Sequence, residues 1–233
     1  MRSASIAFVL LTACAGTAGR APSHFDLTQF APLFDGATLN GFVTTGGRYD
    51  GHADWRVEDG AIVGRQADVK AGGLLYTERQ YRDFEFSVEV FLTYPFDSGI
   101  FVRMVPPPGG KGVQVTLDYR PGGEIGAIYA DGFLARNDTA SSLWRRDAWN
   151  RVDVRCRGTP IHVEAWLDGT KIADHRVADP DAYASIGRIG LQVHGGRDEP
   201  PDACVKFRDL RIRELQDASA SEERAAPTRT GGQ

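Results

Sequence analysis

Short segments in which apolar and polar side chains alternate recur along this chain, and this period of two limits its fold more than any other feature. Three such segments follow one another at residues 97–103, 113–118 and 125–129, separated by turns rich in proline and glycine. Successive side chains of a β-strand point to opposite faces of a sheet. The pattern therefore predicts three consecutive antiparallel strands, each with one face in the core.

Further segments extend this pattern over most of the chain. Residues 84–91 and 205–215 alternate in the same way. Asp59-Gly60 and Asp168-Gly169 each separate two short strand-like runs, which is typical of β-hairpins. The sequence shows no long helical periodicity and no internal repeat. We therefore expect an all-β protein, a two-sheet antiparallel sandwich of the jelly-roll type.

The two faces of the three consecutive strands differ in chemistry. The apolar positions, which we expect in the core, are Ile100, Val102, Val113, Val115, Leu117 and Ile128. The opposite positions are Phe101, Arg103, Gln114, Thr116, Asp118 and Tyr129. Charged, amide, hydroxyl and aromatic groups on neighbouring strands form a hydrogen-bonding surface of the kind that binds sugars.

Gln192 and His194 are expected to share one face of another strand, because they alternate with apolar Leu191 and Val193. Histidine is the side chain that ordinarily titrates near neutral pH, so His194 is the first candidate for proton transfer. The alternative is a histidine that is hydrogen-bonded within the sandwich.

Two tryptophans are candidate stacking platforms for a sugar. Trp144 lies in the polar stretch 131–147, which does not alternate and is expected to be a functional loop. An aromatic anchor that fixes this loop to the core is the alternative for Trp144. Trp166 shares a predicted polar face with His162 and Glu164.

The first residues are similar to a bacterial lipoprotein signal. Arg2 precedes an apolar run from Ile6 to Leu11, and Leu11-Thr12-Ala13-Cys14 then matches a lipobox in which Cys14 becomes the lipidated first residue. An ordinary secretory signal cut near Cys14 is the alternative. Both readings predict export, and the first predicts a protein of the bacterial cell envelope, periplasmic or anchored to the outer membrane by lipid alone.

The composition changes at both ends of the predicted domain. Residues 1–14 are the signal, and the small and polar residues 15–24 suit a flexible tether. Residues 25–215 are expected to form one domain, and residues 216–233 lack the apolar side chains that a folded segment needs. The net charge of −4, without a basic cluster, excludes a nucleic-acid partner.

Two cysteines remain beyond Cys14. Cys156 and Cys204 are free to form a disulfide in an exported protein. By parity, meaning the strand face that alternation assigns to a side chain, Cys156 lies with the core residues. Cys204 alternates out of phase with its apolar neighbours, which argues against the bond. Their spacing is not that of zinc ligands.

Ordered matches along the predicted strands give the chain a resemblance to the bacterial family of 3-keto-disaccharide hydrolases, also described as 3-keto-glucoside 1,2-lyase/3-keto-2-hydroxyglucal hydratases. Typical matches are Ser98-Gly99-Ile100-Phe101-Val102-Arg103 and Gly126-Ala127-Ile128-Tyr129. The others lie at 33–42, 55–60, 81–85, 149–150, 166–169, 189–195 and 205–210. This resemblance implies a concanavalin-like jelly roll that binds a carbohydrate.

The reaction that the resemblance implies is cleavage of a 3-keto-glycoside by removal of the C2 proton, β-elimination of the C1 substituent and hydration. Such a site needs a base, a cation or donor at the enolate oxygen, and an acid at the leaving oxygen. The candidates are His194 or Asp118 as base, Arg103 at the enolate, and Tyr129 as acid. Both charged residues also have a structural alternative to a catalytic role. Arg103 could form an ion pair with Asp118, and Asp118 could support a turn. A divalent ion beside Asp118 or His194 stays open, and no metal ligand is predicted.

The chain departs from the family pattern at Gln114 and Thr116, where the family commonly reads Glu-Val-Gln. A carboxylate is thereby replaced by an amide. The alternative function is therefore a non-catalytic, carbohydrate-binding envelope lipoprotein with a degenerate site. A retaining glucanase ranks last: Glu85 and Glu89 share one strand face, but the closely interleaved acidic signature of laminarinases is absent.

Overall fold

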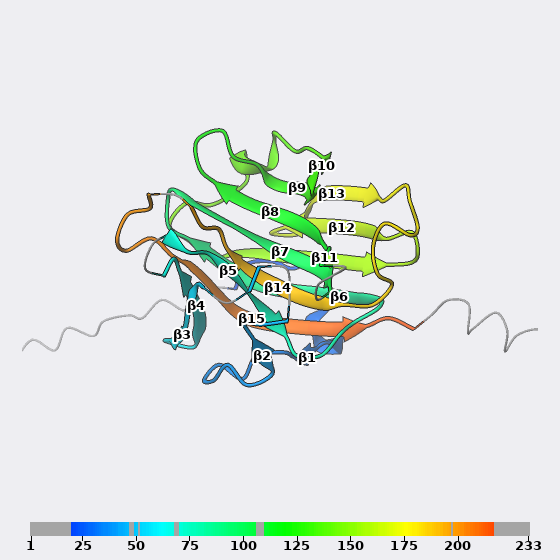
Figure 1. The fold of residues 1–233 in the computed structure, drawn as a ribbon, viewed down its shortest axis with the longest axis horizontal. Helices are drawn as coiled ribbons and strands as arrows, with labels where there is room; N and C mark the ends of the chain where they lie inside the picture. The colour runs from blue at the N-terminus through cyan, green and yellow to red at the C-terminus, as the bar shows by residue number, and fades with distance from the viewer. Residues whose placement is uncertain are drawn as a thin grey trace, which may run out of the picture.

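The alternating segments form strands that pair antiparallel in two stacked sheets (Figure 1). The computed structural model describes residues 20–46, 49–50, 52–67, 70–105, 110–196 and 198–216. The predicted all-β sandwich is therefore confirmed. The predicted signal peptide with Cys14 and the tail after residue 216 lie outside the described residues.

Sheet 1 has the strand order β13-β12-β11-β6-β15-β4-β3, and β1 pairs with β15 beside this path. Its strands are β1 (Ala31–Pro32), β3 (Asp54–Glu58), β4 (Ala61–Arg65), β6 (Phe84–Leu92), β11 (Asn150–Arg157), β12 (His162–Leu167), β13 (Thr170–Arg176) and β15 (Val205–Glu214). The two predicted hairpins are present, because Asp59-Gly60 and Asp168-Gly169 connect β3 to β4 and β12 to β13 with positive φ at all four residues.

Sheet 2 has the order β10-β9-β8-β7-β14-β5-β2. Its strands are β2 (Phe42–Val43), β5 (Gly73–Thr77), β7 (Phe96–Met104), β8 (Val113–Tyr119), β9 (Ile125–Ala130), β10 (Gly132–Ala135) and β14 (Arg188–Val193). Two short 3-10 helices, η1 (Leu27–Gln29) and η3 (Ala140–Ser142), lie outside the sheets. The stretch 131–147, expected to be a loop, thus contributes β10 and η3.

The main core lies between the two sheets. Its members from sheet 2 include the apolar side chains predicted from parity, among them Ile100, Val115 and Leu117, and each is fully buried. Phe86 and Val154 face them from sheet 1. Alternation therefore sends the other side chains of β7, β8, β9 and β14 to the outer face of sheet 2, away from sheet 1.

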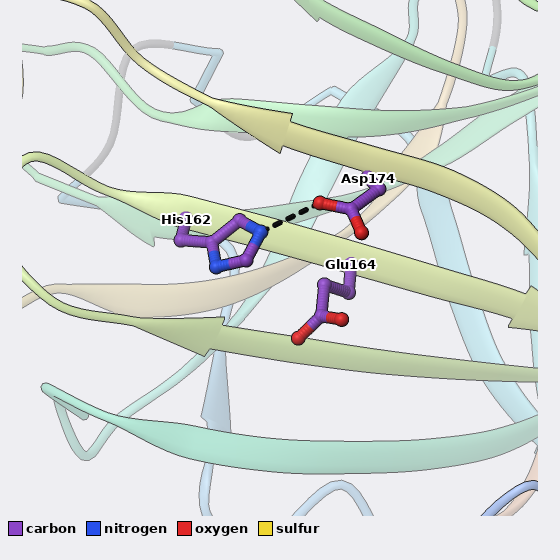
Figure 2. A group of neighbouring side chains, drawn as sticks. All are labelled: His162, Glu164 and Asp174. Atoms are coloured by element: carbon purple, nitrogen blue, oxygen red, sulfur yellow. Dashed lines mark hydrogen bonds and ion pairs between the residues drawn. The ribbon is translucent and has the colours of Figure 1, made fainter.

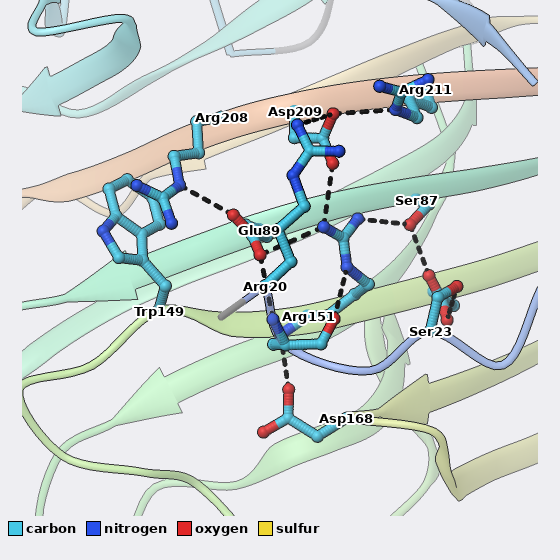
Figure 3. A network of polar contacts seen from close by, with 12 residues as sticks. Arg20, Ser23, Ser87, Glu89, Trp149, Arg151, Asp168, Arg208, Asp209 and Arg211 are labelled. Atoms are coloured by element: carbon cyan, nitrogen blue, oxygen red, sulfur yellow. Dashed lines mark hydrogen bonds and ion pairs between the residues drawn. The ribbon is translucent and has the colours of Figure 1, made fainter. Parts of the chain in front are cut away.

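The outer face of sheet 1 carries a buried ion network centred on Arg151 (Figure 3). The Nη2 atom of Arg151 lies 3.1 Å from Glu89 Oε1 and 2.9 Å from Asp209 Oδ2. Nη1 donates to Ser87 Oγ over 3.0 Å. Burial by itself raises the pKa of Asp209, but hydrogen bonds from Arg211 and Arg151 lower it below its ordinary value.

The N-terminal segment covers this network. The amide of Ala21 donates to Glu89 Oε1 over 3.2 Å, and its carbonyl accepts from Arg151 Nε over 3.1 Å. Ser23 Oγ donates to Asp153 Oδ2 over 2.8 Å. Burial raises the pKa of Asp153 above its ordinary value despite the hydrogen bonds that it accepts. Residues 21–24, expected to end a free tether, are therefore part of the fold.

The two glutamates considered for a glucanase take part in ion pairs on this same face. Glu85 pairs with Arg155 and Arg213, and Glu89 pairs with Arg151 and Arg208. Both side chains are about 98–99 % buried, since their relative exposures are 2% and 1%. The ion pairs with arginine therefore agree with the low rank of a glucanase site at these glutamates.

The cysteines are both buried and not bonded to each other. Burial raises the pKa of the Cys156 thiol to about 12. Cys156 contributes to the main core, as its parity indicated. None of the helices in the described part of the chain has the length and apolar composition that crossing a membrane requires.

Candidate functional site

A cavity of about 620 Å³ opens on the outer face of sheet 2. The residues predicted for the site that line it are Phe101, Gln114, Thr116, Asp118, Tyr129, Gln192 and His194. They come from β7, β8, β9 and β14, which the strand order places side by side, except His194, which directly follows β14. Residues that lie far apart in the sequence thus meet in one hollow, as parity predicted.

Strand register arranges these side chains in rows across the sheet. Phe101 pairs with Gln114, Gln114 with Tyr129, and Tyr129 with Phe133 of β10. Asp97 pairs with Asp118 four residues further along the same strands. The cavity therefore has an aromatic end at the first row and a charged end at the second. Four residues of extended strand separate the two ends by about 13 Å.

An amide pair lies between the two ends. Gln114 Nε2 donates to Gln192 Oε1 over 2.7 Å. Gly99 provides the space, because a Cβ atom added there would lie 2.1 Å from Gln114 Nε2. Thr116 Oγ1 donates to the Glu124 carbonyl over 2.7 Å and accepts from the Ala127 amide over 3.0 Å. The threonine hydroxyl is therefore used to hold β9 against β8.

The charged end contains Asp97, Asp118, Arg120 and His194. Nε and Nη2 of Arg120 donate to the two oxygens of Asp118, both over 2.6 Å. Arg120 Nη2 also lies 2.7 Å from Asp97 Oδ2. The hydrogen bond with Asp118 raises the pKa of Arg120, so the guanidinium stays charged.

His194 lies beside the carboxylate of Asp97. Its amide donates to the Asp97 carbonyl over 3.2 Å, and its Nε2 atom lies 3.8 Å from Asp97 Oδ2. The side chain keeps 40% of its surface exposed to the cavity side, whereas that of Asp97 keeps 10%. A carboxylate beside an imidazole orients the ring and stabilises its protonated form.

These residues do not fit a divalent ion. A divalent ion here would have to bind the carboxylate oxygens of Asp97 and Asp118, but Arg120 already contacts both carboxylates. The arrangement therefore does not support a metal beside Asp118 or His194.

The predicted role of Arg103 at the site is wrong. Arg103 has a φ of 51°, and the register between β7 and β14 shifts at this point, so alternation is broken after Val102. Its side chain is fully buried and donates to the carbonyls of Arg82 and Gly158 and to Asp83 Oδ1, over 2.9, 2.8 and 2.7 Å. The guanidinium therefore links β7 to the segments that contain Arg82, Asp83 and Gly158, and it does not line the cavity. The alternative of an ion pair between Arg103 and Asp118 is also wrong, because Arg103 pairs with Asp83.

Neither predicted tryptophan lines the cavity. Trp144 is 6% exposed and packs in the main core, with its ring 5.9 Å from that of Tyr119, so it anchors the segment that follows β10. Trp166 lies on the outer face of sheet 1, stacked on His24 with ring centroids 4.1 Å apart. The expectation that these rings stack on a sugar at this site is wrong, because the first is buried and the second is on the other sheet.

His162, Glu164 and Asp174 form a second polar cluster beside Trp166 on β12 and β13 (Figure 2). His162 Nε2 lies 2.7 Å from Asp174 Oδ1, and hydrogen bonds from His162 and Lys171 lower the pKa of Asp174 to about 2. Lys171 Nζ donates to Glu164 Oε1 over 2.8 Å and also to Asp174. The ammonium group thus takes the place that a cation would need, and the cluster is an ion network.

Several residues of the cavity were not predicted from the sequence. Asp97 lies two alternation steps before Phe101 and Arg120 one step after Asp118, so extending the alternation along each strand would have included both. Tyr49 and Phe133 lie in segments without a clear pattern. No signal in the sequence brings those two rings to the cavity.

The family comparison agrees with this arrangement. A family model described as the 3-keto-alpha-glucoside-1,2-lyase-like domain matches residues 29–213. The chain belongs to this family. The resemblance stated from the motifs is thereby confirmed, and the 3-keto-alpha-glucoside-1,2-lyase-like domain accounts for nearly the whole described fold. The protein is therefore a member of a carbohydrate-active, glycosyl hydrolase-like family.

Solved structures share the fold of this 3-keto-alpha-glucoside-1,2-lyase-like domain. A putative glycosyl hydrolase from Parabacteroides distasonis has a TM-score of 0.61 at 19% identity, covering 81% of this chain and 95% of its own. The carbohydrate binding module CBM66 from Bacillus subtilis has a TM-score of 0.53 at 15% identity, covering 75% and 96%. A search of curated proteins finds no match.

Proposed function

We propose that this protein cleaves 3-keto-glycosides by elimination and hydration, in the cavity on sheet 2. The observation that carries the proposal is the charged end of the cavity, where His194 and Asp97 lie beside the Asp118–Arg120 pair. An imidazole, two carboxylates and a guanidinium supply both proton transfer and charge stabilisation. Membership of a family described as 3-keto-alpha-glucoside-1,2-lyase-like supports this reaction class.

The proposed reaction has two stages. A base removes the C2 proton, the C2–H electron pair forms the enolate with the C3 ketone, and the C1–O bond then breaks as the enolate collapses to an enone. The leaving alkoxide takes a proton. Water then adds to the enone, with hydroxide at C1 and a proton at C2, which gives the 3-keto sugar. The sum of the two stages is hydrolysis, without an oxidant or reductant.

His194 is the proposed base. Both oxygens of Asp118 accept from Arg120, whereas the His194 side chain remains 40% exposed in the cavity. Asp97 is positioned to stabilise the imidazolium that proton removal produces. Asp118 is then a positioning residue that fixes the guanidinium of Arg120, although the sequence also offered it as a base.

Arg120 takes the electrostatic role that the sequence assigned to Arg103. Its guanidinium lies at the charged end of the cavity, where an enolate oxygen near His194 would develop negative charge. Tyr129 remains the proposed acid for the leaving oxygen, with C1 placed between the two rows so that the phenol, which extends from the aromatic row, meets the C1–O bond there. A substrate would therefore lie along the strands, with C2 and C3 at the charged end.

The direct test is incubation of the purified protein with 3-keto-glucosides and with their unoxidised parents, following enone absorbance and sugar release. We expect release from the keto substrates only, without a requirement for added divalent metal. Release from the unoxidised glycosides alone would contradict the elimination mechanism. Saturable binding without turnover of either class would favour the alternative, a carbohydrate-binding protein with a degenerate site.

The Gln114–Gln192 pair is the observation that favours this alternative. Where the family commonly has a carboxylate, this chain has an amide hydrogen-bonded to a second amide. Gln192 is able to turn its amide and donate to a carboxylate at position 114, so a Gln114→Glu variant is expected to fold. The wild-type protein is expected to act without this acid.

The expected result for Gln114→Glu is a change in kcat smaller than about tenfold, measured with the same keto substrates. Gln114→Leu, which removes the hydrogen bond and keeps a similar volume, is the matched control for disturbance of the pair. Turnover that appears only in the glutamate variant would mean that the natural protein binds sugars without cleaving them.

We also propose that the protein is exported and anchored by a lipid at Cys14, as the lipobox indicates. Metabolic labelling with a palmitate analogue tests this, with Cys14→Ser as the unlabelled control. The described residues begin with Arg20, which pairs with Asp209 on the outer face of sheet 1, on the opposite side of the sandwich from the cavity. An anchored domain would therefore present the cavity away from the attachment point.

A further inference from the structure

Large aromatic side chains are exposed at the aromatic end of the cavity. Tyr49 and Phe133 line the cavity and keep 42% and 44% of their surface exposed. Phe101 and Tyr129 lie between them, and Leu74 also contributes to the lining. Large apolar side chains that stay exposed together in a hollow mark a binding surface more often than a structural one.

Both exposed rings are held in place by neighbouring groups. The Phe133 ring meets that of Tyr129 edge to face at a centroid distance of 5.3 Å. The guanidinium carbon of Arg136 lies 3.9 Å from the Phe133 centroid, and Arg136 pairs with Glu124. A ring fixed by one edge contact and one cation contact is pre-organised for a ligand on its remaining surface.

Tyr49 is fixed on the other flank. Its amide donates to Tyr76 Oη over 3.2 Å, and its ring centroid lies 6.1 Å from that of Phe101. Burial raises the pKa of Tyr76 to about 12, so this phenol stays neutral. The neighbouring Asp50, which also lines the cavity, accepts a hydrogen bond from the Gly46 amide. The loop that carries Tyr49 is thus tied to the sheet.

We propose that this aromatic end, formed by Tyr49, Phe101, Tyr129 and Phe133, is a subsite for a flat aromatic aglycone, so that the preferred substrates are aryl 3-keto-glycosides. The inference rests on the proposed function for the orientation of the sugar. The charged end lies about 13 Å away along the strands, which leaves room for a sugar and a second ring between them. A second sugar would carry hydroxyl groups around its ring, and the rings of Phe101 and Phe133 offer no hydrogen-bond partners for them.

Binding of unreactive ligands tests the subsite independently of catalysis. Dissociation constants of phenyl and methyl glucosides, both anomers, and of a glucose disaccharide are measured by calorimetry on the full chain. We expect the phenyl glucoside to bind about tenfold more tightly than the methyl glucoside and the disaccharide. Phe133→Ala is expected to remove most of this preference and to leave the affinity for the methyl glucoside unchanged.

Leu134→Ala is the matched control, because Leu134 is also exposed on β10 but does not line the cavity. It is expected to keep the preference for the phenyl ligand. Equal affinities for phenyl and methyl ligands, tighter binding of the disaccharide, or no measurable binding of the phenyl glucosides would overturn the proposal. A preference that persists in a protein without turnover of keto substrates would retain the subsite and reject only the proposed enzyme.

Discussion

A His194→Asn variant is expected to lose turnover of 3-keto-glycosides by a factor of about 10² to 10⁴ while keeping its affinity for unreactive glycosides. The reason is that His194 supplies the imidazole of the charged end, with its side chain 40% exposed and its Nε2 atom 3.8 Å from Asp97 Oδ2. Asparagine keeps a polar group but cannot transfer the proton. Steady-state kinetics and calorimetry on the same preparations measure the two quantities.

His162→Asn is the matched control for this variant. His162 also pairs with an aspartate, since its Nε2 atom lies 2.7 Å from Asp174, but it lies on sheet 1 and does not line the cavity. Its replacement is expected to leave kcat within about twofold of the wild type. Equal losses in both variants would indicate a general effect on folding, and full activity of His194→Asn would reject His194 as the base.

An Arg151→Met variant is expected to lose about 3 to 5 kcal/mol of unfolding free energy. Arg151 is 1% exposed and lies between Glu89 and Asp209, so its removal leaves two buried carboxylates without their shared cation (Figure 3). Chemical denaturation followed by tryptophan fluorescence measures the change. The melting temperature is expected to fall by about 6 to 20 °C for a domain of this size.

Two further variants separate this effect from a general one. Arg56→Ala removes an exposed pair with Asp54 on the same sheet, and its effect is expected to stay below about 1 kcal/mol. Asp209→Asn placed in the Arg151→Met background is expected to recover part of the loss, because one buried charge is then absent. Asparagine also tolerates the positive φ of 50° at this position. No difference between Arg151→Met and Arg56→Ala would contradict the energetic role of the network.

Parity was sufficient to predict most of the cavity. Gln114, Thr116 and Asp118 reach one face because β8 is regular from Val113 to Tyr119. The same rule brought Tyr129 and His194 to that face from two other strands. Hydrophobic burial enforces it, since a shift by one residue would move Val115 and Leu117 out of the core.

Arg103 shows where parity stops being informative. A single residue with positive φ ends the alternation of β7, and nothing in the local sequence marks this arginine as that residue. The pairing of Arg103 with Asp83 depends on a connection that precedes β6. Continued alternation after Asp118 places Arg120 on the cavity face, but only its contacts with Asp97 and Asp118 identify it as the cation of the charged end.

The sequence by itself determined that the chain forms an antiparallel sandwich, which side chains of each regular strand leave the core, and the family to which the chain belongs. Alternation and turn residues are local properties, so they can be read along the chain. Only the tertiary structure decided which cation serves the cavity, that Trp144 and Trp166 lie elsewhere, and that Tyr49 and Phe133 form an aromatic end. These outcomes depend on strand order, register shifts and segments without periodicity, which are set by contacts between residues distant in the sequence.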